Sequence, residues 1–301
     1  TLSSSSAASD VYKRQGIMSC VNMNEMLKDA QKHGYAVGAF NIVNYLTTEA
    51  VIKASEELRS PVILQTSTST VKQIGLKPLI DMLIPMAEAA SVPVAIHLDH
   101  CTDVEMVYKC IDAGWSSVMI DASKESFEKN IQITADVVKY AAAKNVSVEG
   151  ELGAIVGVED DIKVDDKDAM LADPVKSVQY VKETDIHAFA PAIGTAHGLY
   201  KGEPKVDFDR FKLIADTCNC PMVVHGGTGL SPEVFKKLIA LGGAKINIST
   251  AIKIAYCGGM TEYTSTHSSE NNPLKLDKFV LQKVKECTVE HIEIFGSKGR
   301  G

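Results

Sequence analysis

From residue 35 to the carboxyl terminus, short apolar runs rich in β-branched residues alternate with longer stretches of helical periodicity. A short, continuous apolar run is typical of a strand that is buried on both faces, as in a parallel sheet. The chain is therefore predicted to contain eight strands, within residues 35–41, 61–67, 93–100, 116–123, 146–153, 188–196, 221–229 and 244–250.

The segments between these runs place apolar residues three and four positions apart, which predicts amphipathic helices. Val51, Ala54 and Leu58 are one example. The pairs Asp173–Pro174 and Ser231–Pro232 are typical helix starts. Eight strands joined by helices favour an α/β protein made of a single (β/α)8 (TIM) barrel. A doubly wound open sheet is the alternative, but no GxGxxG motif opens the first strand–helix unit.

Composition and charge narrow the class of protein further. The 301 residues are 45% hydrophobic and 23% charged, with a formal net charge of −7. A general nucleic-acid binder would show a basic excess, so nucleic acid is excluded as an expected partner. No apolar run approaches the roughly 20 residues that span a bilayer, so no membrane association is expected. The seven cysteines show no framework of a secreted protein, which indicates reduced thiols and a cytoplasmic location.

The first residues differ from everything that follows. The stretch TLSSSSAASDVYKRQ is rich in Ser and Ala and lacks the apolar segment of a signal peptide. We expect residues 1–17 to be a non-native or disordered leader, and residues 18–301 to form the barrel domain.

Reactive side chains gather at the predicted strand ends, where barrels of this class build their active sites. The third strand ends in His97, Asp99 and His100 and the fourth in Asp121; Glu149 and Glu151 lie on the fifth, His197 closes the sixth, and His225 closes the seventh. Three imidazoles that leave one coordination position open are the pattern of a catalytic zinc site. The alternative is three unrelated polar strand ends.

Two loops indicate a phosphate site. Gly226, Gly227, Thr228 and Gly229 stand between the seventh strand and a predicted helix, and Asn247, Ser249 and Thr250 follow the eighth. Glycines let backbone N–H groups approach an anion, and the helix N-terminus adds a favourable dipole. Loops after strands seven and eight are where phosphate sites recur in this fold.

The segment 154–174 is long and acidic, and it has no clear secondary-structure pattern. Loops of this length are commonly lids. Glu159, close after Gly157, is the carboxylate expected to swing into a closed site, whereas Asp165, Asp166 and Asp168 are expected to be solvated. A metal that polarises a carbonyl, a phosphate grip and two separated carboxylates together suit carbon–carbon cleavage next to the carbonyl of a sugar phosphate.

At these residues the chain resembles the class II, zinc-dependent ketose-bisphosphate aldolases, from about Met23 to the C-terminus. The resemblance rests on YAVGAFN, AIHLDHC, SVMIDAS, VEGELG, GTAHGLY, VVHGGTGLS and KINIST, in the order and spacing of that family. It implies cleavage of fructose or tagatose 1,6-bisphosphate to dihydroxyacetone phosphate and glyceraldehyde 3-phosphate. It also implies one catalytic Zn²⁺ per subunit, a monovalent cation in some members, and a homodimer or homotetramer.

The same resemblance assigns roles to residues. It implies that His100, His197 and His225 bind zinc, that Asp99 is the acid/base at the C4 hydroxyl, and that Glu159 exchanges the proton of the enediolate. Contacts to the triose phosphate are implied for Gly198, Gly226, Gly227, Thr228, Asn247, Ile248, Ser249 and Thr250, and an alternative ion site for Asp121 and Glu151. His97 has no ligand role in that pattern and is expected to be structural.

One position departs from the family pattern. Members specific for fructose bisphosphate usually have N-x-D-T after the eighth strand, whereas tagatose-bisphosphate members tend to have a small residue in place of the aspartate. Here the residue is Ser249, which leaves the choice between the two sugars open. Lys253 matches a place where a basic residue can meet the distal phosphate; the alternative is a solvated helix lysine.

The same residues bear on other functions of this fold. Zinc hydrolases of this fold usually take an HxH pair from the first strand, and residues 35–41 contain no histidine. A non-catalytic, aldolase-like subunit would be expected to lose ligands, whereas all three histidines and Asp99 are present. An aldolase acting on another phosphorylated ketose remains an alternative.

Overall fold

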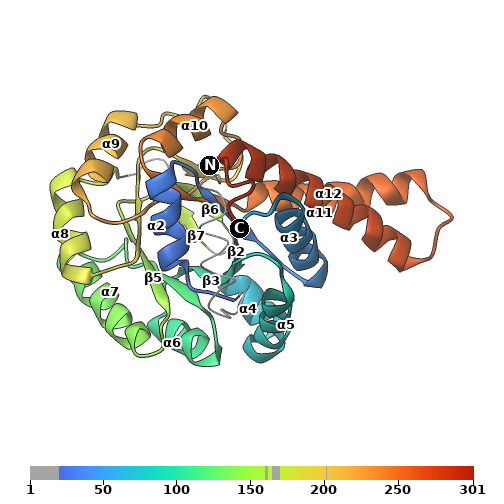
Figure 1. Ribbon diagram of the computed structural model, residues 1–301, viewed down its shortest axis with the longest axis horizontal. Coiled ribbons are helices and arrows are strands. Elements are labelled where there is room, and N and C mark those ends of the chain that lie inside the picture. The colour runs from blue at the N-terminus through green and yellow to red at the C-terminus, as the bar shows by residue number, and fades with distance from the viewer. Residues whose placement is uncertain (1–19, 160–161, 165–169, 201) are drawn as a thin grey trace, which may run out of the picture.

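A computed structural model of the chain describes residues 20–159, 162–164, 170–200 and 202–301, without the side chains of residue 156, of residues 158–159 and of residues 162–164. Eight parallel strands close into a barrel in the order β1-β11-β10-β8-β5-β4-β3-β2. Helices surround the barrel, and α11 and α12 extend away from it (Figure 1). The predicted (β/α)8 architecture is therefore confirmed. The leader expected at residues 1–17 lies outside the described residues.

The barrel strands fall within the eight predicted runs, apart from one-residue extensions of β3 and β11. They are β1 (Val37–Asn41), β2 (Val62–Ser67), β3 (Val94–Cys101), β4 (Ser117–Ile120), β5 (Ser147–Leu152), β8 (Ala188–Pro191), β10 (Met222–Val224) and β11 (Gly243–Ile248). Parallel pairing continues around the whole ring, for example Ala39 opposite Ile63 and Ala39 opposite Asn247. The carboxyl ends of the strands therefore meet at one mouth.

Helices occupy the connections that the apolar spacing predicted. Those before β11 are α2 (Met23–His33), α3 (Tyr45–Leu58), α4 (Thr68–Ile74), α5 (Leu76–Ala89), α6 (Val104–Ala113), α7 (Phe127–Ala142), α8 (Pro174–Thr184), α9 (Phe208–Thr217) and α10 (Pro232–Ala240). The predicted starts are correct, because Asp173 and Ser231 cap α8 and α10 by accepting hydrogen bonds from backbone N–H groups. After β11 come α11 (Thr250–Thr266) and α12 (Pro273–Phe295), and α12 packs against α11 and α3.

The barrel interior has an apolar end and a polar end. Met23, Leu27 and Ala30 of α2 pack into a buried cluster with residues of the barrel strands such as Val37 and Ile63. Helix α2 thereby plugs the amino-terminal end of the barrel. Towards the carboxyl ends of the strands, the interior positions hold buried polar and charged residues. Such residues are usually exposed, so their burial at the mouth points to a functional role.

Two expectations about the mouth were wrong. The segment after β5 is a hairpin, not an irregular loop: β6 (Val156–Glu159) pairs with β7 (Ile162–Val164). His197 does not close a barrel strand either, since β8 ends at Pro191 and His197 lies in β9 (Ala196–His197), which pairs with β6. These three short strands form a second sheet, β7-β6-β9.

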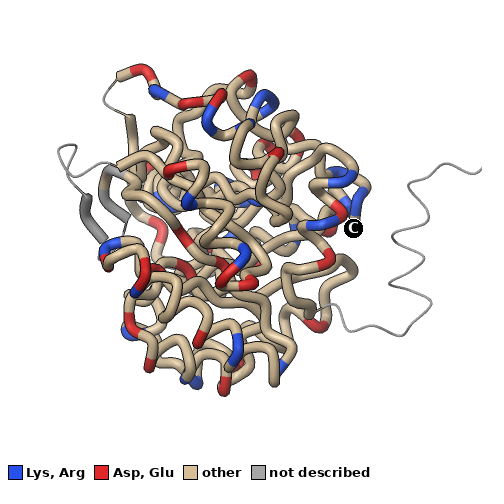
Figure 2. The backbone as a smooth tube through the Cα atoms, turned by 90° about the vertical axis from the view of Figure 1, so that its left-hand side faces the viewer, with Lys and Arg blue, Asp and Glu red and all other residues tan. Residues whose placement is uncertain are grey.

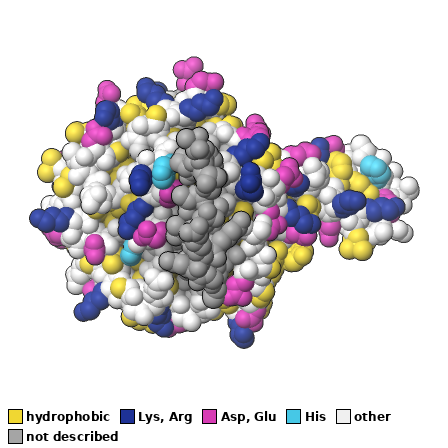
Figure 3. All heavy atoms as spheres, viewed as in Figure 1, with side chains coloured by type: hydrophobic (Ala, Val, Ile, Leu, Met, Phe, Trp, Pro, Cys, Tyr) yellow, Lys and Arg dark blue, Asp and Glu magenta, His cyan; other side chains and the backbone are white. Residues whose placement is uncertain are grey.

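Positively and negatively charged residues are intermixed along the backbone (Figure 2). They are also intermixed on the face of the molecule that Figure 3 shows. No basic patch of the kind that follows a nucleic-acid backbone stands out among the described residues on that face. Within the described part of the chain, none of the helices has the length and apolar character to cross a membrane.

Candidate active site

The end of β3 places Asp99 and His100 in the mouth together. Regular strands send neighbouring side chains to opposite faces, but the β3–β4 register shifts between Leu98 and Cys101. His100 also has a φ of 44°, in the left-handed region that non-glycine residues seldom adopt. This local departure from strand geometry lets two consecutive side chains serve one site, and strain of this kind is typical of functional positions.

Three predicted zinc ligands converge there. His100, His197 and His225 are all buried, and each offers a ring nitrogen within 4.8 Å of the others. The His100 ring lies 4.8 Å from the His197 ring and 4.5 Å from the His225 ring, centroid to centroid. Three imidazoles around one point are a donor set that suits zinc.

Asp121 and Glu151 form a second group with His100, again with candidate ligand atoms within 4.8 Å of one another. The Asp121 carboxylate Oδ2 lies 3.1 Å from His100 Nδ1, and Glu151 Oε2 lies 3.8 Å from the same nitrogen. A cation could therefore be held on either side of His100.

The protonation states differ across this cluster. Burial and the neighbouring His100 lower the pKa of His225 to about 4, so its imidazole is neutral at neutral pH and keeps a lone pair. Burial also acts to lower the pKa of His100, but the neighbouring Asp99 and Asp121 outweigh it and raise this pKa well above the usual value. Burial and the Asp121 charge raise the pKa of Glu151. Metal binding at His100 would therefore release a proton.

Asp99 is buried beside two side-chain amides. Its Oδ2 accepts hydrogen bonds from Asn41 Nδ2 at 3.2 Å and Gln65 Nε2 at 3.4 Å. Donors of this kind fix the orientation of a carboxylate. Asp99 is next to the histidine cluster in sequence and in space.

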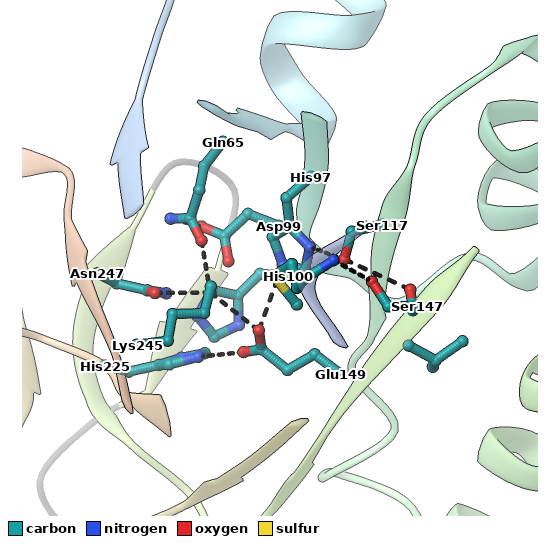
Figure 4. A network of polar contacts seen from close by, with 12 residues as sticks. Gln65, His97, Asp99, His100, Ser117, Ser147, Glu149, His225, Lys245 and Asn247 are labelled. Carbon is teal, nitrogen blue, oxygen red and sulfur yellow. Dashed lines mark hydrogen bonds and ion pairs between the residues drawn. The ribbon is translucent and has the colours of Figure 1, made fainter. Parts of the chain in front are cut away.

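Below the cluster lies a buried network that sequence analysis missed. Lys245 is fully buried inside the barrel and contacts Glu149, Gln65 and Asn247 (Figure 4). Lysine is rarely buried without partners, and its place in the run GAKINI gave no sign of which partners those were. His97 contributes to the same layer: its Nδ1 lies 2.8 Å from Ser117 Oγ and its Nε2 lies 3.4 Å from Glu149. It contacts Glu149, which in turn contacts His225, so His97 lies one residue away from the cluster.

The two predicted phosphate loops pack on each other. The Gly227 N–H donates to the Asn247 carbonyl at 3.3 Å, and Thr228 Oγ1 accepts from the Ala251 N–H at 3.1 Å. A Cβ on Gly227 would approach that carbonyl oxygen to 2.7 Å, and Gly226 has a φ of 66°. Glycine is thus required at both positions for the loops to approach each other.

At the start of α11, the N-cap residue Ser249 makes no side-chain capping bond, and its buried Oγ has no hydrogen-bond partner among the described residues. Thr250 opens the helix and Lys253 lies one turn further on. The Ile248 side chain instead belongs to the apolar cluster outside the barrel, so a substrate contact at Ile248 would have to use its backbone.

Tyr200 is a further residue that sequence analysis missed. Its hydroxyl accepts from the Ala196 N–H at 3.0 Å and donates to the Gly226 carbonyl at 2.9 Å. It thereby ties the segment of His197 and Gly198 to the loop that follows His225. The predicted lid carboxylate, Glu159, ends β6, and its side chain lies outside the described residues.

The closed barrel, with a buried cluster of histidines and carboxylates that could hold a metal ion, is consistent with a lyase of the aldolase class. The family model for class-II fructose-bisphosphate aldolase matches residues 21–300, and the chain belongs to this family of aldehyde-lyases. The predicted family resemblance and enzyme class are confirmed.

Individual relatives agree with this assignment. The chain is similar to the fructose-bisphosphate aldolases of Geobacillus stearothermophilus (42% identity, 94% of this chain, 99% of the relative) and of Helicobacter pylori strain ATCC 700392 / 26695 (37%, 93% and 99%). Among solved structures, it is similar to the YdjI aldolase of Escherichia coli K12, with a TM-score of 0.82 and 32% identity over 93% of this chain and 99% of that one.

Proposed function

We propose that this chain is a zinc-dependent aldolase that reversibly cleaves a ketose 1,6-bisphosphate to dihydroxyacetone phosphate and glyceraldehyde 3-phosphate. The observation that carries the proposal is the convergence of three buried imidazoles beside Asp99, at the mouth of a barrel from the class-II aldolase family. The relatives from Geobacillus stearothermophilus and Helicobacter pylori are fructose-bisphosphate aldolases, which supports fructose 1,6-bisphosphate as the first substrate to test.

The residues present fit a zinc ion. His225 donates through Nε2 to Glu149 at 2.7 Å, and its buried Nδ1 has no hydrogen-bond partner among the described residues. A buried nitrogen lone pair facing two other histidines is the arrangement that metal ligands adopt. We therefore assign His100, His197 and His225 as the ligands. A zinc ion bound there would polarise the substrate carbonyl as a Lewis acid.

The chain's own groups move the protons. In the cleavage direction, Asp99 accepts the proton of the C4 hydroxyl, the C3–C4 bond breaks, and its electrons remain on the triose phosphate as an enediolate. Glyceraldehyde 3-phosphate leaves as the aldehyde. Glu159 then supplies a proton to C3 of the enediolate, which gives dihydroxyacetone phosphate. Asn41 and Gln65 hold Asp99 in place for its step.

Substrate binding is assigned to the packed loops. We propose that Gly198, Gly226, Gly227, Thr228, Asn247, Ser249, Thr250 and the Ile248 backbone contact the triose phosphate, with the start of α11 favouring the anion. Lys253 would meet the distal phosphate. Asp121 and Glu151 would hold an alternative ion position with His100, and a monovalent cation beside the phosphate is part of the same proposal.

The cellular setting is also proposed. All seven cysteines are free thiols in the structure, which supports a reducing, cytoplasmic compartment. We propose a homodimer or homotetramer. Residues 18–301 are proposed as the catalytic domain, without the leader at 1–17.

Tagatose 1,6-bisphosphate is the second candidate substrate, because Ser249 offers a small, unpartnered hydroxyl where fructose-specific relatives are expected to have a carboxylate. The two sugars differ only in configuration at C4, so one hydrogen bond can discriminate them.

The test is cleavage of both sugars side by side, with metal-loaded protein, chelator-treated protein and protein restored with zinc. Chelator-sensitive, zinc-restored cleavage of either sugar supports the proposal, and the ratio of kcat/KM values defines the preference. If zinc-loaded protein cleaves neither sugar, the proposed substrate is wrong, and another phosphorylated ketose or a non-catalytic role takes its place.

A further inference from the structure

Lys245 is a buried cation whose ammonium contacts three polar side chains. Its Nζ lies 2.9 Å from Glu149 Oε2, 2.7 Å from Gln65 Oε1 and 2.7 Å from Asn247 Oδ1. The contacts with Gln65 and Asn247 are hydrogen bonds that the ammonium donates, and the contact with Glu149 is an ion pair. Figure 4 shows Lys245 between these side chains, inside the barrel and next to the histidines.

The first contact leads to the proposed metal site. Glu149 is fully buried and its other oxygen, Oε1, accepts from His225 Nε2 at 2.7 Å. Because Nε2 then carries the proton, Nδ1 is the nitrogen that keeps a lone pair for a metal. Lys245 thus holds the carboxylate that fixes the tautomer and the ring orientation of His225.

The second contact leads to the proposed substrate site. Asn247 turns its Oδ1 towards the ammonium, which leaves its Nδ2 as the donor that faces elsewhere. That buried Nδ2 has no hydrogen-bond partner among the described residues. An amide held by its oxygen with an unused N–H₂ group can donate to an oxygen of the substrate.

The third contact leads to the acid/base. Gln65 accepts from Lys245 through Oε1, so its Nε2 must point the other way, where it donates to Asn41 Oδ1 at 2.8 Å and to Asp99 Oδ2 at 3.4 Å. Asn41 in turn donates to the same Asp99 oxygen at 3.2 Å. One cation therefore sets the direction of both amides that hold Asp99.

We propose that Lys245 is the positioning residue of the active site: through separate contacts with Glu149, Asn247 and Gln65, it orients the metal ligand His225, the substrate contact Asn247 and the acid/base Asp99. This inference rests on the roles assigned under the proposed function.

The test separates the three contacts with variants. Glu149→Gln breaks the path from Lys245 to His225 and also weakens the contact of Glu149 with His97. Gln65→Met breaks the path from Lys245 to Asn41 and Asp99. Lys245→Met breaks all three paths with little change in volume. Ile63→Val, in the apolar layer beneath, is the control for a general loss of packing. Each protein is compared for zinc affinity, by competition with a chromophoric chelator, and for kcat, KM and Tm.

Glu149→Gln is expected to weaken zinc binding about 10–100-fold, as loss of a group behind a metal-bound histidine commonly does. Gln65→Met is expected to keep zinc affinity within about twofold and lower kcat roughly tenfold, through a misplaced acid/base. Lys245→Met is expected to combine both losses and to raise KM. Ile63→Val is expected to lower Tm while leaving zinc affinity and kcat unchanged.

Two results would overturn the inference. One is a Lys245→Met protein that binds zinc and turns over like the parent. The other is a set of variants whose zinc affinity and kcat fall only in proportion to their loss of Tm, as a purely structural lysine would give. His225→Ala separates this failure from that of the proposed function: if it still binds zinc like the parent, then the ligand assignment itself is wrong.

Discussion

Asp99 is the residue on which the proposed chemistry depends most directly. Its neighbours Asn41 and Gln65 donate to one of its oxygens, and the histidine cluster begins at the next residue. Within β3, Asp99 is therefore the residue placed to act as the acid/base. His97, two residues earlier, is fully buried against Ser117 and Glu149 and does not join the cluster.

Asp99→Ala is expected to retain zinc binding and triose-phosphate binding, while kcat falls by roughly 10²–10⁴-fold, the usual contribution of a positioned acid/base. Steady-state kinetics and zinc titration of the variant check this. Near-parental turnover would show that another group accepts the C4 hydroxyl proton.

At this scale, sequence analysis correctly grouped Asp99, His100, His197 and His225, because reactive types recurred at predicted strand ends. It could not find Lys245, Gln65 or Tyr200. The Lys245–Gln65 contact spans 180 positions, and pairing at that distance leaves no local pattern. The sequence motif also did not show that the Ile248 side chain packs in the apolar cluster outside the barrel, so that a substrate contact there would use the backbone.

Among the elements, the β6–β9 pairing is the one that positions a predicted ligand. Gly157 lies opposite His197 in this pairing and has a φ of 108°. A Cβ at Gly157 would approach the His197 carbonyl oxygen to 2.2 Å, so only glycine fits. Gly157 is thus a packing position beside His197, not only a source of flexibility for Glu159.

Gly157→Ala is therefore expected to displace His197 and weaken zinc binding by at least about tenfold. Gly258→Ala is the matched control, because Gly258 lies in helix α11 with open space around its Cα. That change is expected to leave zinc affinity unchanged and to stabilise the helix by roughly 0.5–1 kcal/mol. Chelator competition and thermal unfolding check both proteins; equal zinc affinity would contradict the role of Gly157.

The hairpin that contains Gly157 could have been predicted in part. Residues 156–159 and 162–164 alternate apolar and other residues around Asp160–Asp161, which is a hairpin pattern. The acidic content of the segment drew the interpretation towards a lid. Partners far along the chain, such as the strand that carries His197, are decided by tertiary packing and not by local sequence.

Across the whole molecule, the barrel was predictable because all eight strands are buried on both faces and each is followed by an amphipathic helix. The packing of α12 was not. Its His291 ring lies among Phe40, Phe235 and Phe295, with centroid distances of 5.8–6.3 Å. Burial in this aromatic setting lowers the pKa of His291 below its usual value of 6.5.

This burial makes stability depend on pH. A lowered folded-state pKa contributes stability above the unfolded pKa, near 6.5, and that stability is lost as pH falls towards the folded pKa. Between pH 7.5 and 5.5, the free energy of unfolding of the parent is expected to fall more steeply than that of His291→Gln. The difference in slope is at most about 1.4 kcal/mol per pH unit. Denaturant titrations across this range check it, and parallel slopes would contradict the burial argument.

The central claim is that one metal ion held by three histidines makes this barrel a catalyst. The most direct test is to strip the protein of metal and titrate zinc back while following cleavage of fructose 1,6-bisphosphate and tagatose 1,6-bisphosphate. We predict activity that rises in proportion to zinc, saturates at one ion per chain, and is absent from His225→Ala at the same zinc level. Cleavage that persists without metal, or that His225→Ala retains in full, would contradict the account.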